Sequence, residues 1–193
     1  KTLAEAKAMV GQDVTVRGVV TAVSPYAEEY GNFGVLIEDA TDGLYLYRVS
    51  GTEAYAKFIV GQEIEVTGTM DQYNGLYEMK NVQMDTFKVT NEKATIPGPT
   101  PMSNELQDQG KAAELKEAVW NGSAFEKDGS TYAYFYSSSW LAEKPELVKG
   151  ATYTVIGWLN WYNAPQISPL QAPELVSEAP AHTHTACPEC GKC

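Results

Sequence analysis

Histidine and cysteine are absent from residues 1–178 of this 193-residue chain. Their absence excludes disulfides, thiol chemistry and the Cys–His and Ser–His nucleophilic schemes from that region. The same region lacks the sequence motifs of phosphate-binding loops, dinucleotide-binding turns and zinc proteases. Paired carboxylates occur at Glu28-Glu29 and at Glu63 and Glu65, but charged outer strand faces commonly carry such pairs. We therefore expect the protein not to be an enzyme.

Positive charge is scarce, with 14 Lys and Arg against 25 Asp and Glu, a formal net charge of -11. The acidity is spread evenly, since residues 1–88 alone hold 13 acidic and 7 basic groups. The affinity of proteins for duplex DNA comes largely from cations that neutralise phosphates, so we expect no duplex DNA partner. No apolar run reaches the length of a membrane span. The chain starts at Lys1 without a signal peptide, which is typical of a processed product or an excised piece.

Proline and glycine divide the chain. The stretch at residues 97–101, Pro-Gly-Pro-Thr-Pro, is not expected to hold regular structure. We predict a first domain at 1–90, a linker at 91–109, a second domain at 110–178 and a Cys/His-rich tail at 179–193.

The first domain is predicted to consist of short strands. Its apolar residues alternate, as at Val14, Val16 and Val20, which should share one face. Asn74-Gly75 predicts a tight hairpin. The expected strands lie at 14–20, 34–39, 44–47, 63–70 and 76–82, with a short helix at 50–58 between the third and fourth.

The second domain matches the first at an offset of 89. Gly61, Val66 and Gly68 align with Gly150, Val155 and Gly157, Tyr73-Asn74 with Tyr162-Asn163, and Tyr45 and Tyr47 with Tyr134 and Tyr136. We interpret this as an ancient duplication. Residues 111–120 have the composition of a helix. They also fit the first strand of the repeat at an offset of 99, which aligns Gly110 with Gly11 and Lys116 with Arg17, and we favour the strand.

Five strands with a helix between the third and fourth is the order of the OB-fold, a small Greek-key barrel. The segments 16–21, 35–40, 43–47, 60–68 and 73–75 resemble the OB-fold modules of bacterial secreted and surface proteins, a family of the nucleic-acid-binding type. The resemblance implies an all-β protein of two tandem five-stranded barrels, the second divergent. It further implies a secreted or cell-surface location, flanking domains in a longer chain, and single-stranded nucleic acid as a ligand class.

The first candidate site lies on the third strand of each domain. Leu44 and Leu46 should point into the barrel, and Tyr45 and Tyr47 outward. In the repeat the equivalent outward residues are Tyr134 and Tyr136. Aromatic rings on this face of an OB-fold stack on bases or sugars. The alternative is that these tyrosines cover the barrel or pack between the domains.

The second candidate is the aromatic hairpin of the second domain. Trp158 and Ile156 share one face, and Tyr153, Val155, Leu159 and Trp161 share the other. Apolar residues on both faces indicate that the outer face is covered, either by the first domain or by a partner. The alternative is a sugar-stacking surface that contains Trp158.

The tail is the only candidate metal site. His182, His184, Cys187, Cys190 and Cys193 offer the ligands that zinc prefers. The alternative is a linker whose real partners lie downstream. No other cofactor is indicated, because the acidic turn at 39–43 lacks the ligand spacing of a calcium loop.

These observations favour a non-catalytic binding or spacer module of a larger secreted or surface protein. Oligosaccharide suits an acidic, tyrosine-rich face. Single-stranded nucleic acid, which the resemblance implies, and zinc at the tail are the alternatives.

Overall fold

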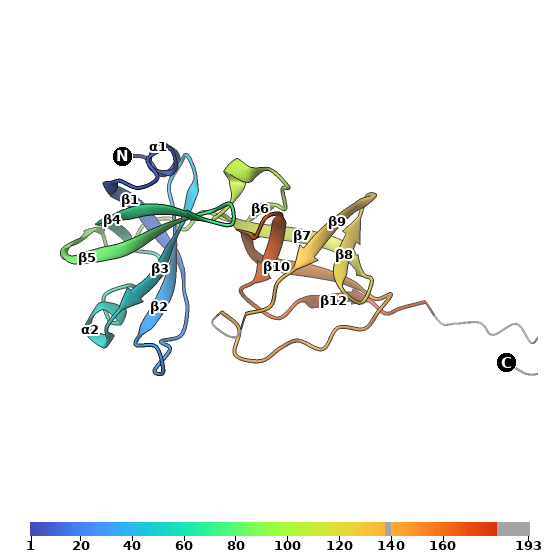
Figure 1. The fold of residues 1–193 in the computed structure, drawn as a ribbon. Helices are drawn as coiled ribbons and strands as arrows, with labels where there is room; N and C mark the ends of the chain where they lie inside the picture. Colours follow the sequence, from blue (N-terminus) through green and yellow to red (C-terminus); the bar gives the residue numbers. More distant parts are fainter. Residues whose placement is uncertain (138–139, 181–193) are drawn as a thin grey trace, which may run out of the picture.

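The computed structural model describes residues 1–137 and 140–180, and the predicted zinc ligands of the tail lie outside these ranges. Two small β-barrels lie side by side (Figure 1), which confirms the predicted fold class. No helix in the described part of the chain is long and apolar enough to cross a membrane.

The first barrel closes in the strand order β1-β2-β3-β5-β4. Its strands are β1 (Asp13–Val23), β2 (Asn32–Glu38), β3 (Gly43–Ser50), β4 (Glu63–Tyr73) and β5 (Leu76–Asn91). The short helix α2 (Thr52–Tyr55) lies between β3 and β4, as predicted. Alternation places the expected side chains inside, since Val16, Val20, Leu44 and Leu46 are buried.

One helix was not predicted. The segment α1 (Leu3–Lys7) begins after Thr2, whose hydroxyl accepts from the backbone N–H of Glu5, while the Glu5 carboxylate accepts from the N–H of Thr2. This reciprocal capping box is readable in the sequence as Thr-x-x-Glu. Leu3 and Ala6 then bury against the first barrel.

The second barrel repeats the connectivity of the first. Its strands close in the order β7-β8-β9-β11-β10 and back to β7. They are β7 (Ala112–Trp120), β8 (Ala124–Lys127), β9 (Ser130–Tyr134), β10 (Thr152–Trp161) and β11 (Pro165–Pro169), with β12 (Glu174–Ser177) added beside β10. Residues 112–120 therefore form a strand, the alternative that the 99-residue offset favoured.

The proline-rich stretch between the barrels does hold some regular structure. Thr100–Pro101 forms β6, which pairs in parallel with β7, and Leu106–Asp108 forms the 3-10 turn η1. The expectation of no regular structure at 97–101 is wrong at its end, because a proline is tolerated in an edge strand where its missing N–H is not needed.

The two barrels do not match at one constant offset. Val14 lies opposite Gly68 and Ala113 opposite Gly157, so β1 and β7 differ by 99 and β4 and β10 by 89. Tyr45 lies opposite Glu78 as Ala133 lies opposite Gln166, so β3 and β9, and also β5 and β11, differ by 88. Two changes of length produce this pattern. The connection from the third to the fourth strand is one residue longer in the second barrel, as the separations of Tyr45 from Gly68 and of Ala133 from Gly157 show, and the next hairpin is one residue shorter, since Gln72 pairs with Tyr77 but Trp161 with Pro165.

A one-residue slip reverses which face of a strand a side chain occupies. The equivalents of Tyr45 and Tyr47 are therefore Ala133 and Phe135, and Tyr134 takes the inward place of Leu46. The predicted equivalence of the two tyrosine pairs is wrong for this reason. Tyr134 instead packs against Trp120 and Phe125 in the second barrel, with ring centroids 5.6 and 5.4 Å away.

Buried polar groups form one part of the contact between the two barrels. Buried Lys7 forms an ion pair with Asp42 at 2.8 Å and donates to the carbonyl of Gln109 at 2.7 Å, and burial lowers the pKa of this amine. The backbones at Gly43 and Gly110 approach so closely that a side chain at either glycine would collide with the other. The Gln109 side chain in turn contacts the backbone N–H of Tyr77 and carbonyl of Gly75 in the first barrel.

Candidate ligand-binding groove

A groove of about 630 Å³ lies between the two barrels. Each barrel contributes the outer face of its third and fifth strands and the tip of its long hairpin. Four pairs of equivalent positions line it: Tyr73 with Tyr162, Tyr47 with Phe135, Glu78 with Gln166, and Lys80 with Ser168. The hairpin tips touch, since the N–H of Asn163 donates to the carbonyl of Asn74 at 2.6 Å.

Aromatic rings form the floor of the groove. Tyr45 lies 5.3 Å from Trp158 and 5.9 Å from Trp140, measured between ring centroids. Gly34 of β2 makes room for this cluster, because a Cβ there would lie 2.8 Å from Tyr45 and 3.1 Å from Trp140. Burial, with a smaller effect from Glu78, raises the pKa of Tyr45 well above its ordinary value. The hydroxyl of Tyr45 therefore stays neutral. Its ring packs between the barrels, which is one of the alternatives that the sequence left open.

Trp158 lies on the outer face of its strand, as alternation predicted, but the first barrel covers it. It is 2% exposed and packs with Leu36 and Leu76 of that barrel. Tyr47, at the equivalent of Phe135, remains partly exposed at the groove. The structure thus brings three of the predicted residues, Tyr45, Tyr47 and Trp158, into one site.

The first barrel supplies the charges of the groove. The Arg48 guanidinium lies 5.0 Å from the centre of the Tyr47 ring, and the Lys80 amine lies 5.5 Å from it. Lys80 forms ion pairs with Asp71 and, at 3.1 Å, with the buried Glu78, whose pKa burial raises. Within residues 1–137 and 140–180, no carboxylate lies within ion-pair distance of Arg48, which leaves its charge available to a ligand.

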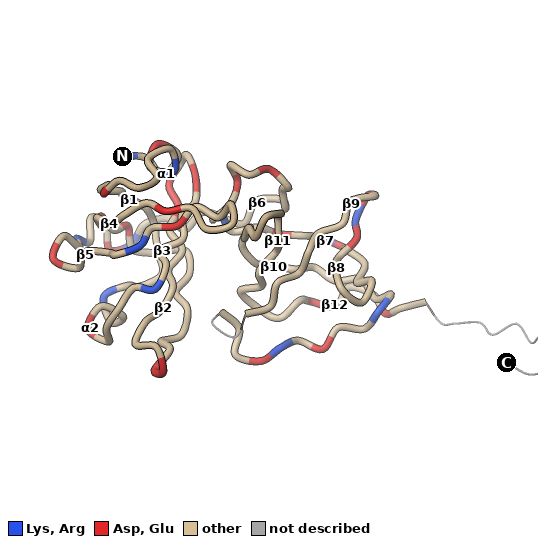
Figure 2. The backbone as a smooth tube through the Cα atoms, viewed as in Figure 1, with Lys and Arg blue, Asp and Glu red and all other residues tan. Residues whose placement is uncertain are grey.

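Cations elsewhere on the molecule are scattered. Figure 2 shows Lys and Arg distributed over both barrels among more numerous acidic residues, without a basic stripe. The groove is therefore a local site with one open cation, and it does not belong to a broad basic surface.

The second barrel supplies uncharged hydrogen-bonding groups. Trp158 lies opposite Ser168 and Asn160 opposite Gln166, so these four residues form a square on the outer face of β10 and β11. Asn160 donates to the Ser168 hydroxyl at 3.1 Å and accepts from the backbone N–H of Trp161. The indole N–H of Trp158 and the amide oxygen of Gln166 are buried and have no hydrogen-bond partner in the described structure.

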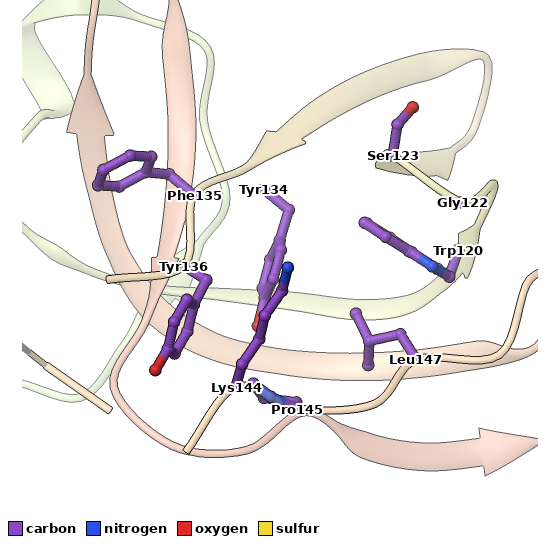
Figure 3. Close-up of a pocket in the computed structure, with 9 residues that line it drawn as sticks. All are labelled: Trp120, Gly122, Ser123, Tyr134, Phe135, Tyr136, Lys144, Pro145 and Leu147. Atoms are coloured by element: carbon purple, nitrogen blue, oxygen red, sulfur yellow. The ribbon is translucent and has the colours of Figure 1, made fainter. Parts of the chain in front are cut away.

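Tyr134 and Tyr136 line a second cavity, which is formed by the second barrel alone. This cavity, of about 530 Å³, also contains Trp120, Lys144 and Leu147. Figure 3 shows Tyr134 between Tyr136 and Trp120, with Phe135 pointing away from them. The hydroxyl of Tyr134 is buried without a hydrogen-bond partner in the described structure, and burial raises its pKa to about 12. The two predicted pairs of tyrosines therefore do not form one platform.

Sequence reasoning missed the polar lining of the groove. No recognisable sequence motif contains the polar residues Arg48, Glu78, Asn160 and Gln166. The only readable signal was at residues 165–169, where polar Gln166 and Ser168 alternate with buried Ile167 and therefore indicate a polar outer face.

No family model matches the chain. Among curated proteins it is similar to endonuclease YhcR of Bacillus subtilis (strain 168), with 28% identity over 106 residues. The match covers 54% of this chain and 8% of that relative, so this chain spans a small part of the relative's length.

Solved structures with similar folds include two DNA complexes. One is a murine DNA-binding protein bound to double-stranded DNA, with a TM-score of 0.44, 11% identity and coverage of 86% of this chain and 100% of that chain. The other is the HINa domain of Ifi202 with a 20-base-pair duplex, with a TM-score of 0.37, 13% identity and coverage of 88% and 97%. At such low TM-scores and identities we draw no conclusion about the ligand from these two structures.

Proposed function

We propose that the two barrels form a non-catalytic module that binds single-stranded nucleic acid in the groove between them. The observation that carries the proposal is the composition of the groove, where aromatic rings lie beside an unpaired Arg48 and a row of uncharged polar groups. Single-stranded nucleic acid is bound by this combination, in which bases stack on rings and cations contact the backbone.

The similarity to part of an endonuclease adds support, because such an enzyme acts on nucleic acid. Catalysis is not part of the proposal. The described groove contains no histidine or cysteine, and its one buried carboxylate, Glu78, is engaged by Lys80. Secretion and flanking domains stay predictions from the resemblance noted in the sequence.

The test is a titration of tryptophan fluorescence with a short oligothymidylate at several salt concentrations. Tyr47→Ala should weaken binding by about 1–3 kcal/mol, the contribution of one stacked base. Arg48→Gln should weaken binding and reduce the salt slope by about 0.7, which corresponds to one phosphate contact. Tyr30→Ala is the control, because Tyr30 is 67% exposed and does not line the groove.

A duplex of the same sequence should bind more weakly, because its bases are already stacked and paired. Binding of the duplex at least as tight as that of the single strand, or an equal effect of Tyr30→Ala and Tyr47→Ala, would refute the proposal.

Oligosaccharide is the second candidate, and the net charge of -11 favours it because an acidic surface repels phosphates. Sugars also stack on tryptophan and tyrosine. A ligand of this kind should bind with little salt dependence and should be insensitive to Arg48→Gln, so the same titration with neutral oligosaccharides separates the two candidates.

A further inference from the structure

Two of the unpartnered polar atoms of the second barrel belong to residues that line one wall of the groove. Trp158 and Gln166 occupy diagonal corners of the β10–β11 square, and the other two corners, Asn160 and Ser168, are hydrogen-bonded to each other. Diagonal cross-strand neighbours are close enough for long side chains to contact the same group. The wall therefore offers one donor, the indole N–H, and one acceptor, the amide oxygen.

Leaving these two atoms unpaired is costly. A buried polar group without a partner destabilises a protein, because it has lost its hydrogen bonds to water and gained none in the folded state. Both residues line the cavity, so a ligand group that reaches these two buried atoms can supply the missing partners. The opposite wall differs, since the first barrel contributes Arg48 and Lys80 there.

We infer that the second-barrel wall receives the Watson–Crick edge of an unpaired base, while the first-barrel wall holds the backbone of the strand. This inference rests on the proposed function. Every nucleobase carries an acceptor next to a donor on that edge, and the edge is free only in unpaired nucleotides. With thymine, the indole N–H of Trp158 donates to O4 and the amide oxygen of Gln166 accepts from N3–H.

The inferred contact has two consequences. The groove discriminates single strands from duplexes by hydrogen bonding as well as by stacking. It also tolerates many sequences, because the same donor and acceptor pair fits each base.

The experiment compares oligothymidylate with the same oligonucleotide carrying N3-methylthymidine, which still stacks but has lost its N3–H donor. Wild-type protein should bind the methylated strand about fivefold more weakly, the effect of one net hydrogen bond. Gln166→Met should bind both strands equally, with the weaker affinity.

Gln62→Met is the matched control. Gln62 also buries an amide oxygen without a partner, but it lies directly before β4 and does not line the groove. This variant should retain the preference for the unmethylated strand, and thermal unfolding of both variants shows whether each is folded.

The outcomes separate the two proposals. Equal binding of both strands by the wild type would overturn the inference and leave the proposed function standing. A preference that persists in folded Gln166→Met would also overturn the inference. Failure of the wild type to bind either strand would remove the proposed function together with it.

Discussion

The two barrels share their strand connectivity and present the same face to the groove, yet they fill that face with different chemistry. In the first barrel the face carries Tyr47, Arg48, Glu78 and Lys80. In the second barrel the positions of Tyr47, Glu78 and Lys80 are occupied by Phe135, Gln166 and Ser168, all uncharged. The comparison shows how one fold used twice makes a groove with one charged wall and one neutral wall.

The largest expected difference in stability is between alanine variants of Trp158 and of its equivalent in the first barrel, Thr69. Trp158→Ala should lower the free energy of unfolding by about 3–5 kcal/mol, because it removes a buried indole from the contact between the barrels. Thr69→Ala should cost about 0.5–1 kcal/mol, since it removes an exposed hydrogen bond to Asp13 and a long one from Asn81.

Chemical denaturation of the two variants measures this difference. Similar losses from both substitutions would contradict the claim that the barrels pack through the outer face of the second.

A smaller difference in stability is expected between glutamine variants of Glu38 and Glu126. The two residues are equivalent, since each lies opposite the start of the third strand of its barrel. Glu38 is 4% exposed and accepts from the backbone N–H of Ala112 at 2.9 Å, and burial raises its pKa. The folded protein therefore holds this proton to higher pH than the unfolded chain does, and stability falls as pH rises above the unfolded value of 4.5.

Glu38→Gln keeps an acceptor for Ala112 and removes the titration. At neutral pH it should be more stable than the wild type, on the order of 1 kcal/mol, and the gain should vanish as pH falls below the unfolded value. Glu126→Gln, at an exposed position, should stay within about 0.5 kcal/mol of the wild type. Denaturation curves across the acidic range check both. A gain that is largest at acidic pH would contradict the account of Glu38.

The sequence predicted the fold well because alternation is a local property. Leu44 and Leu46 point inward whatever the rest of the chain does, and the glycines and hairpin dipeptide of the first barrel mark its bends. It did not predict the shift in register at the third strand, because the Tyr-Asn match gives the offset of 89 only for the end of the fourth strand, and the connection that precedes this strand is one residue longer in the second barrel. The predicted equivalence of Tyr134 and Tyr45 is therefore wrong.

The groove itself could not be predicted, because it depends on how the barrels dock. That docking uses contacts between residues far apart in the chain, such as Lys7 with Gln109 and Glu38 with Ala112. Neither carries a motif, and Trp140 joins the cluster from a segment without regular structure.

The most direct measurement follows the four indole N–H signals of the protein by nuclear magnetic resonance as a short oligothymidylate is added. Trp140, Trp158 and Trp161 line the groove, and Trp120 lies in the second cavity. We predict that the signal of Trp158 moves furthest, that Trp140 and Trp161 move with it, and that Trp120 stays in place. A shift confined to Trp120, or no shift of Trp158 at saturating ligand, would contradict the assignment of the groove as the binding site.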